Sequence, residues 1–183
     1  MSRRESALLV VDVQAKLVPH IPRYERMVWN IGRLIDGAKV LGVPVQATEQ
    51  YPRGLGATVP ELAGRLEKIP EKSTFSCGGC PDIFHDWQQR GIFKILVVGI
   101  EAHVCVQQTV LDLLHAGFQV YVAVDAVGAR FDVDYQTALR RMDSAGATLT
   151  TTESALFEWC EESGTPEFKQ ISALVRQTAP EAN

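Results

Sequence analysis

Short apolar runs rich in valine and isoleucine recur along the chain, and polar or turn-forming segments separate them. Continuous runs of this kind are typical of strands that are buried on both faces of a parallel sheet. Four strong runs predict strands at Ala7–Asp12, Val43–Thr48, Ile95–Ile100 and Val120–Asp125. Two weaker runs predict short strands at Ile69–Phe75 and Ala147–Thr151.

Between the predicted strands, apolar residues recur at the three- to four-residue spacing of a helix that buries one face. This spacing predicts helices at Tyr24–Leu41, Val104–Ala116 and Tyr135–Ala145. A glycine follows each of them, as expected where a helix ends in a residue with positive φ. Strands that alternate with helices form βαβ units with right-handed crossovers. The sequence therefore predicts a three-layer α/β/α fold around a mostly parallel, Rossmann-like sheet of five to six strands.

The chain has 183 residues, a length that suits a single domain over residues 1–183. Long loops are expected at Tyr51–Pro60 and Ser76–Pro81, and the polar tail Gln177–Asn183 is expected to fray. The net charge of −4 weighs against nucleic acid or an anionic membrane surface as a partner. No run approaches the ~20 apolar residues of a membrane span. A small molecule is the expected partner.

The N-terminus places two arginines before an apolar run, as a signal peptide does, but Asp12 interrupts that run after five residues. Four cysteines in a chain of this length do not form a disulfide scaffold. Both observations favour a cytoplasmic, reducing location.

Three residues that could carry chemistry lie at the ends of predicted strands. Cys105 follows the Ile95–Ile100 strand at the start of a helix, where unpaired N–H groups and the helix dipole favour a thiolate. Asp12 ends the first predicted strand, and Lys72 lies in the short Ile69–Phe75 segment. Ligands of parallel α/β sheets bind at the carboxyl ends of strands. If these residues converge there, they supply a nucleophile, a base and a stabilising positive charge.

Each of these residues also has a purely structural interpretation. A single cysteine is usually a buried, inert thiol, and an aspartate at a strand end often caps the next turn. Most lysines are solvated surface charges. Cys77 and Cys80 form a Cys-x-x-Cys pair before a helical stretch, so a redox protein stays an alternative, as do structural cysteines. His103 lies two residues before Cys105, and on a tight turn such a residue usually points elsewhere.

Three segments together resemble the isochorismatase-like cysteine hydrolase family, most of all its isochorismatase domain-containing proteins. They are Val-Val-Asp12-Val-Gln, Lys72-Ser-Thr-Phe-Ser, and Gly99-Ile-Glu-Ala-His-Val-Cys105-Val. The segments occur in the family's order, and the likeness covers nearly the whole chain. The resemblance implies a catalytic triad of Asp12, Lys72 and Cys105. It also implies an oxyanion held by the backbone N–H groups of Glu101 and Cys105, with a cis peptide bond at Ile100–Glu101.

Nicotinamidases of this family hold a metal with histidines after the second strand, but Thr48–Arg53 contains no histidine. The resemblance therefore implies a hydrolase without a metal or other cofactor. It would cleave a small amide or related acyl compound through a cysteine thioester. A homo-oligomer, a dimer or larger, is implied by resemblance alone. A catalytically silent binding or scaffold protein of the same fold stays an alternative. By position, the expected substrate pocket consists of Gln14, Glu49, Gln50, Tyr51, Phe75 and Phe131.

Overall fold

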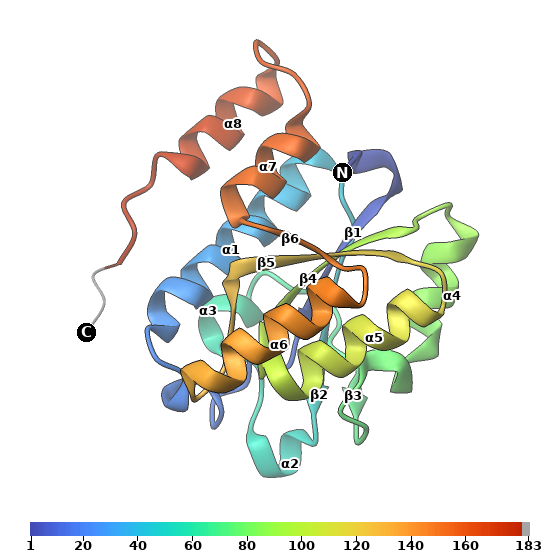
Figure 1. Ribbon diagram of the computed structural model, residues 1–183. Helices are drawn as coiled ribbons and strands as arrows, with labels where there is room; N and C mark the ends of the chain where they lie inside the picture. Colours follow the sequence, from blue (N-terminus) through green and yellow to red (C-terminus); the bar gives the residue numbers. More distant parts are fainter. Residues whose placement is uncertain (181–183) are drawn as a thin grey trace.

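The computed structural model, which describes residues 1–180, contains a central sheet of six parallel strands (Figure 1). The strands lie in the order β3-β2-β1-β4-β5-β6. Their bounds are β1 (Ser6–Val11), β2 (Val45–Gln50), β3 (Glu71–Lys72), β4 (Lys94–Ile100), β5 (Gln119–Gly128) and β6 (Thr148–Thr150). This arrangement confirms the predicted parallel sheet. The last residues of the predicted tail, 181–183, lie outside the described residues.

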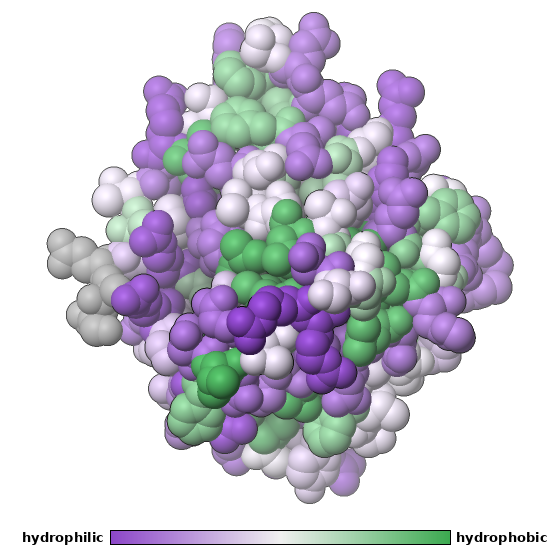
Figure 2. Space-filling view, viewed as in Figure 1, coloured by the Kyte–Doolittle hydropathy of each residue, from purple (hydrophilic) through white to green (hydrophobic). Residues whose placement is uncertain are grey.

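Helices cover both faces of the sheet, so the molecule has three layers (Figure 1). One face carries α1 (Tyr24–Leu41), α3 (Pro60–Ala63), α7 (Thr152–Cys160) and α8 (Pro166–Val175). The other face carries α4 (Pro81–Gln89), α5 (Gln107–His115) and α6 (Asp132–Ser144), and the outer surface of α6 is mostly hydrophilic (Figure 2), although Val133 is exposed there. A single turn, α2 (Pro52–Leu55), lies beyond the strand ends.

The continuous apolar runs arise because the central strands are buried on both sides. In β1, Leu8 and Val10 pack beneath α1, whereas Leu9 and Val11 pack beneath the α4–α6 layer. No position of β1 faces water, so the strand shows no alternation of polar and apolar residues. This burial explains why the central strands could be recognised from the sequence.

Several predicted bounds differ from the structure. The Ile69–Phe75 run forms only the two-residue edge strand β3, and the predicted Tyr51–Pro60 loop contains α2. The helix predicted from Val104 begins instead with a π-helical turn, Ala102–Val106, that leads into α5. Helices α7 and α8 were not predicted.

The sheet order reverses between β1 and β4, which makes their carboxyl ends the expected ligand site. Gly99 lies near the end of β4 with φ of 120°, a conformation that favours glycine. A Cβ atom at this position would collide with the backbone of Val11 on β1. Only glycine therefore lets the two strands approach this closely just before Asp12 and Glu101.

Candidate active site

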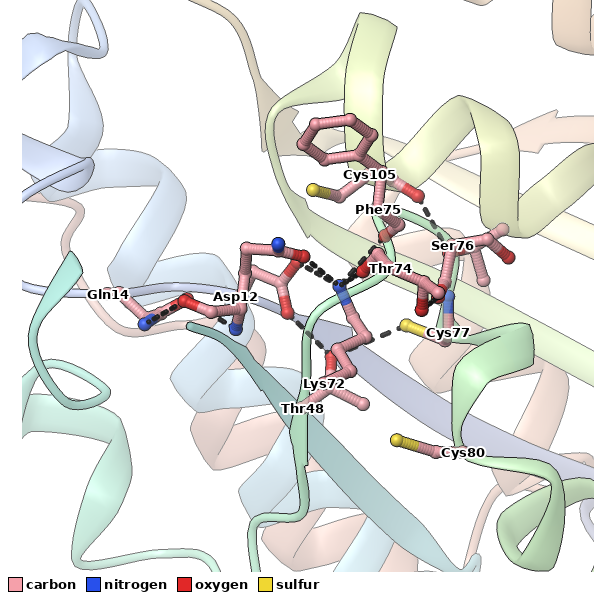
Figure 3. A network of polar contacts seen from close by, with 12 residues as sticks. Asp12, Gln14, Thr48, Lys72, Thr74, Phe75, Ser76, Cys77, Cys80 and Cys105 are labelled. Atoms are coloured by element: carbon pink, nitrogen blue, oxygen red, sulfur yellow. Dashed lines mark hydrogen bonds and ion pairs between the residues drawn. The ribbon is translucent and has the colours of Figure 1, made fainter. Parts of the chain in front are cut away.

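Asp12 is the first residue after β1, and its side chain is fully buried. Its φ of 51° lies in the left-handed region, which aspartate and asparagine visit more readily than most residues. This turn ends the pairing of β1 and directs the carboxylate into the space beyond the strand ends. There the Thr48 hydroxyl donates a hydrogen bond of 2.8 Å to Asp12 Oδ1 (Figure 3).

Lys72 is the second residue of β3, and its ammonium group is also fully buried. Its Nζ lies 2.6 Å from Asp12 Oδ2, so the two charges form a buried ion pair. The same Nζ donates to Gln50 Oε1 at 3.0 Å and to two backbone oxygens, those of Thr74 at 3.2 Å and Phe75 at 2.8 Å. The ammonium group therefore has four oxygen neighbours, which compensates for its loss of water.

Cys105 lies in the π-helical turn after β4, with 5% of its surface exposed. Burial, and secondarily the negative charge of Asp12, raise the pKa of the Cys105 thiol, while Lys72 acts in the opposite direction. The sequence led us to expect a thiol acidified by the helix N-terminus. The structure favours the protonated thiol instead, because the thiol is buried and a carboxylate lies nearby.

Thr109 of α5 ties the π-helical turn that contains Cys105 to the segment that follows Lys72. Thr109 Oγ1 donates to the backbone oxygen of Cys105 at 2.7 Å and accepts the backbone N–H of Cys77 at 2.9 Å. The peptide bond between Ile100 and Glu101 is cis, as the sequence resemblance implied.

A cavity of about 250 Å³ opens above Cys105. It is lined by Leu17, His20, Gln50, Leu55, Phe75, Glu101, Val104, Cys105 and Arg130. Its walls are mostly apolar, and a few polar groups converge on it, as in most small-molecule sites. Cys105, although only 5% of its surface is exposed, is therefore one of the residues that border this cavity.

The structure places two of the expected pocket residues, Gln50 and Phe75, in this cavity, and the other four elsewhere. Gln14 exchanges hydrogen bonds with the backbone of Gln50, and Glu49 accepts from Thr58, so both side chains stabilise loops. Tyr51 and Phe131 are more than half exposed and are absent from the lining of this cavity. Position after a strand does not reveal which way a side chain turns.

Arg130 lines the cavity and carries a charge, and the sequence analysis did not single it out. It follows β5 by two residues and lies 29 positions from Glu101, which it contacts. The only signal in the sequence was its place after a predicted strand. Its partner Glu101 is 7% exposed and also lies 3.4 Å from His103 Nε2.

The Cys-x-x-Cys pair lies beside the Asp12–Lys72 pair. Cys77 is fully buried against Thr48, 3.3 Å from its hydroxyl, and both cysteines are free thiols. Burial is the main cause that raises the pKa of Cys77 to about 11, and burial also raises the pKa of Cys80. A redox motif needs an acidified, accessible thiol, so the geometry favours a structural role for Cys77.

Within residues 1–180, no cluster of three or more His, Cys, Asp or Glu side chains could hold a metal ion. Over the same residues, no helix has the length and apolar character needed to cross a membrane.

Comparisons with known proteins agree with this architecture. The model of the isochorismatase domain matches residues 6–154. Isochorismatase domain-containing protein 2A from Mus musculus is 38% identical over 178 residues, which cover 97% of this chain and 85% of the mouse protein.

Two solved structures extend the likeness. A structure named MAR1 ribonuclease, from Caenorhabditis elegans, is 39% identical with a TM-score of 0.91, covering 100% of this chain and 95% of the nematode chain. The YcaC gene product of Escherichia coli, described as an octameric hydrolase of unknown specificity, is 25% identical with a TM-score of 0.84. That alignment covers 96% of this chain and 86% of the bacterial chain.

Proposed function

Because the chain belongs to the isochorismatase family, we propose that it is a cysteine hydrolase of small amides or related acyl compounds. The observation that carries the proposal is the buried Asp12–Lys72 ion pair beside a thiol that lines a small cavity. Burying two charges carries a desolvation cost, and a protein that served only as a scaffold would not need them at this position.

In the proposed acylation step, Asp12 accepts the thiol proton of Cys105 as the sulfur attacks the substrate carbonyl carbon. The carbon–sulfur bond forms while the carbonyl electron pair moves onto oxygen. The tetrahedral intermediate then collapses, the carbon–nitrogen bond breaks, and the proton held by Asp12 passes to the leaving nitrogen. Because the pKa of the resting thiol is raised, a base that acts during the attack is needed rather than a preformed thiolate.

Hydrolysis of the thioester repeats this chemistry with water. Asp12 takes a proton from water as the oxygen attacks the thioester carbon, and the carbon–sulfur bond breaks. The sulfur of Cys105 then recovers the proton, and the carboxylic acid product leaves. Lys72 acts through Asp12: the ion pair of 2.6 Å fixes the orientation of the carboxylate. The backbone N–H groups of Glu101 and Cys105 are proposed to stabilise the oxyanion.

We also propose that the reaction needs no metal. The segment Thr48–Arg53, where nicotinamidases of this family place histidine ligands, has none. Activity that is unchanged after dialysis against EDTA would support this part of the proposal, and activity restored only by a divalent ion would refute it.

The test is ammonia release from a panel of small neutral and carboxylate-bearing primary amides, with the acyl-enzyme trapped by acid and located by peptide mass spectrometry. We expect an adduct on Cys105, no turnover by Cys105→Ala, and a loss of about 10²–10⁴-fold in Asp12→Asn, in the range of general-base catalysis. Equal activity in Asp12→Asn would eliminate the proposed base. A matched control is Cys160→Ala, which changes a buried cysteine remote from this cavity.

A second candidate function comes from the nematode relative, whose name describes a ribonuclease. Incubation with labelled single-stranded RNA, followed by gel electrophoresis, tests it directly. RNA cleavage that disappears in both Asp12→Asn and Cys105→Ala would assign ribonuclease activity to this site. Cleavage that survives both substitutions would indicate a contaminant.

The E. coli relative is described as octameric, and we propose that this chain also forms a homo-oligomer. Light scattering during size-exclusion chromatography gives the mass directly. A mass of 20.2 kDa would identify a monomer and refute the proposal.

A further inference from the structure

A second cavity, the α1–α3 groove, lies between α1 and α3 on the face of the sheet opposite α4, α5 and α6 (Figure 1). Its volume of about 620 Å³ exceeds the volume of about 250 Å³ of the Cys105 cavity. Its walls are mainly apolar and aromatic, and they include Tyr24, Val28, Trp29, Val59 and Leu62. Cavities of this size and character are typical of small-molecule sites.

The α1–α3 groove is distinct from the Cys105 cavity. The two cavities share no lining residue. Both border the segment 17–20, because Val18 and Pro19 line the groove, whereas Leu17 and His20 line the Cys105 cavity. The proposed hydrolase chemistry therefore leaves the groove without a role.

Arg33 of α1 brings a buried positive charge to this groove. The residue is 7% exposed, and its guanidinium carbon lies 3.9 Å from the centre of the Trp29 ring. Its Nη2 donates to the neutral Asn30 Oδ1 at 2.7 Å, and its Nε has no hydrogen-bond partner within residues 1–180. None of the ion pairs that these residues form includes Arg33. Because a buried arginine is rarely left unpaired, this position favours an anion that the described part of the chain does not supply.

The acidic residues near Arg33 do not compensate its charge. Burial lowers the pKa of Arg33, and the negative charges of Asp125 and Glu153 oppose this shift without cancelling it. Both acids line a separate polar hollow beside α7, which Arg33 also borders. Asp125 already accepts hydrogen bonds from the backbone and the hydroxyl of Thr152. A ligand carboxylate would therefore meet less repulsion in the α1–α3 groove than in that hollow.

The acidic residues that line the groove are either paired or in contact with water. Asp36 forms an ion pair of 3.0 Å with Arg65. Glu25 is partly exposed and Glu61 is exposed, so water screens their charges more than it screens the buried Arg33. Arg33 is thus the charge that a ligand in the groove would meet away from water.

We propose that the α1–α3 groove is a second small-molecule site, which binds a carboxylic acid with an apolar body. The ligand carboxylate accepts hydrogen bonds from the free donors of Arg33, whose planar fork suits a carboxylate. The apolar body packs against Val28 and Leu62. This proposal does not depend on the hydrolase function, because neither Asp12 nor Cys105 takes part in it.

The experiment compares 2-naphthoate with 2-naphthylmethanol, which share a ring system and differ in the carboxylate. Isothermal titration calorimetry measures both dissociation constants. We expect 2-naphthoate to bind at least tenfold more tightly, on the scale of one charged hydrogen bond, and Arg33→Met to abolish this preference. Methionine keeps an apolar stem against Trp29, so 2-naphthylmethanol should bind as before. Arg26→Met removes the same charge from an exposed position of α1 outside the groove and should change neither constant.

Gly32→Leu tests the location of the site without removing Arg33. Gly32 lines the groove, and the nearest atoms to a Cβ at this position belong to the Arg65 side chain, at 3.7 Å. The rest of the leucine side chain would occupy the groove, so both compounds should bind at least tenfold more weakly. Circular dichroism confirms that each variant is folded, and Gly32→Leu keeps the test decisive if Arg33→Met does not fold.

Several results would overturn the proposal. Absence of binding, or binding that neither Arg33→Met nor Gly32→Leu weakens, would mean that the groove is not the site. Equal weakening of both compounds by Arg33→Met would indicate a lost shape rather than a lost charge, and would refute the preference for a carboxylate. Light scattering provides the last test: an assembly that loses mass in Gly32→Leu would show that a second copy of the chain occupies the groove. None of these results depends on turnover at Cys105, so the hydrolase proposal is tested separately.

Discussion

Removing Lys72 and removing Asp12 are expected to have unequal effects on stability. In Lys72→Met the buried Asp12 carboxylate loses the ammonium group and keeps the hydrogen bond from the Thr48 hydroxyl. An uncompensated buried charge of this kind costs about 3–5 kcal/mol. In Asp12→Asn the ammonium group keeps three oxygen acceptors, from Gln50 and two backbone carbonyls. Asparagine also tolerates the φ of 51°, so we expect a cost of only about 1–3 kcal/mol.

Urea unfolding at pH 7, followed by the fluorescence of the buried Trp87 and Trp159, measures both costs. With an m value of about 2 kcal/mol/M, a cost of 4 kcal/mol shifts the midpoint by about 2 M. Lys72→Met should therefore show a midpoint well below that of Asp12→Asn.

The double variant Asp12→Asn/Lys72→Met completes the cycle. Because it contains no buried charge at this position, it should recover part of the stability lost in Lys72→Met. It also keeps the test valid if Lys72→Met alone does not fold. Equal costs for the two single variants, or a double variant less stable than Lys72→Met, would refute the claim that the ion pair is buried and mutually compensating.

Three further predictions follow from separate features. The pKa of Cys105 is raised, so its iodoacetamide alkylation rate should still increase at pH 9, and a plateau below pH 8 would contradict the assignment. Gly99→Ala should cost about 3 kcal/mol in urea unfolding through overpacking and strain, while Gly64→Ala, at an open position with φ of −65°, should be nearly neutral. Thr109→Val should lower kcat for the best amide of the panel more than it raises KM, because it releases the Cys105 carbonyl; an unchanged kcat would contradict this.

The parallel sheet could be predicted because its central strands are buried on both faces. Runs such as Ala7–Val11 show an unbroken apolar pattern that surface segments lack. The edge strand β3 and the helices α7 and α8 were harder to recognise. β3 has two residues, one of them exposed, and α7 has only nine residues, with a polar Thr152 on its buried face and an exposed Phe157 outside it.

The three residues of the candidate triad could be singled out from the sequence because each follows or lies in a predicted strand. The ion pair between Asp12 and Lys72 could not be predicted in this way, since it joins residues that lie 60 positions apart. The pocket was predicted less well, because the direction of Gln14 and Glu49 is set by hydrogen bonds to loops that the sequence does not locate. Arg130 escaped notice for the same reason.

The position of Lys72 on the edge strand has a consequence for how the protein loses activity. β3 pairs with β2 through only two residue pairs, Glu49 with Glu71 and Gln50 with Lys72, and no strand from residues 1–180 lies on its outer side. Edge segments open locally at lower free energy than central strands. Opening of β3 would withdraw the ammonium group from Asp12 while β1 and β4 stay paired. We therefore expect the amide protons of β3 to exchange with solvent much faster than those of β1. Heat should abolish the proposed activity at a lower temperature than the one that melts the sheet.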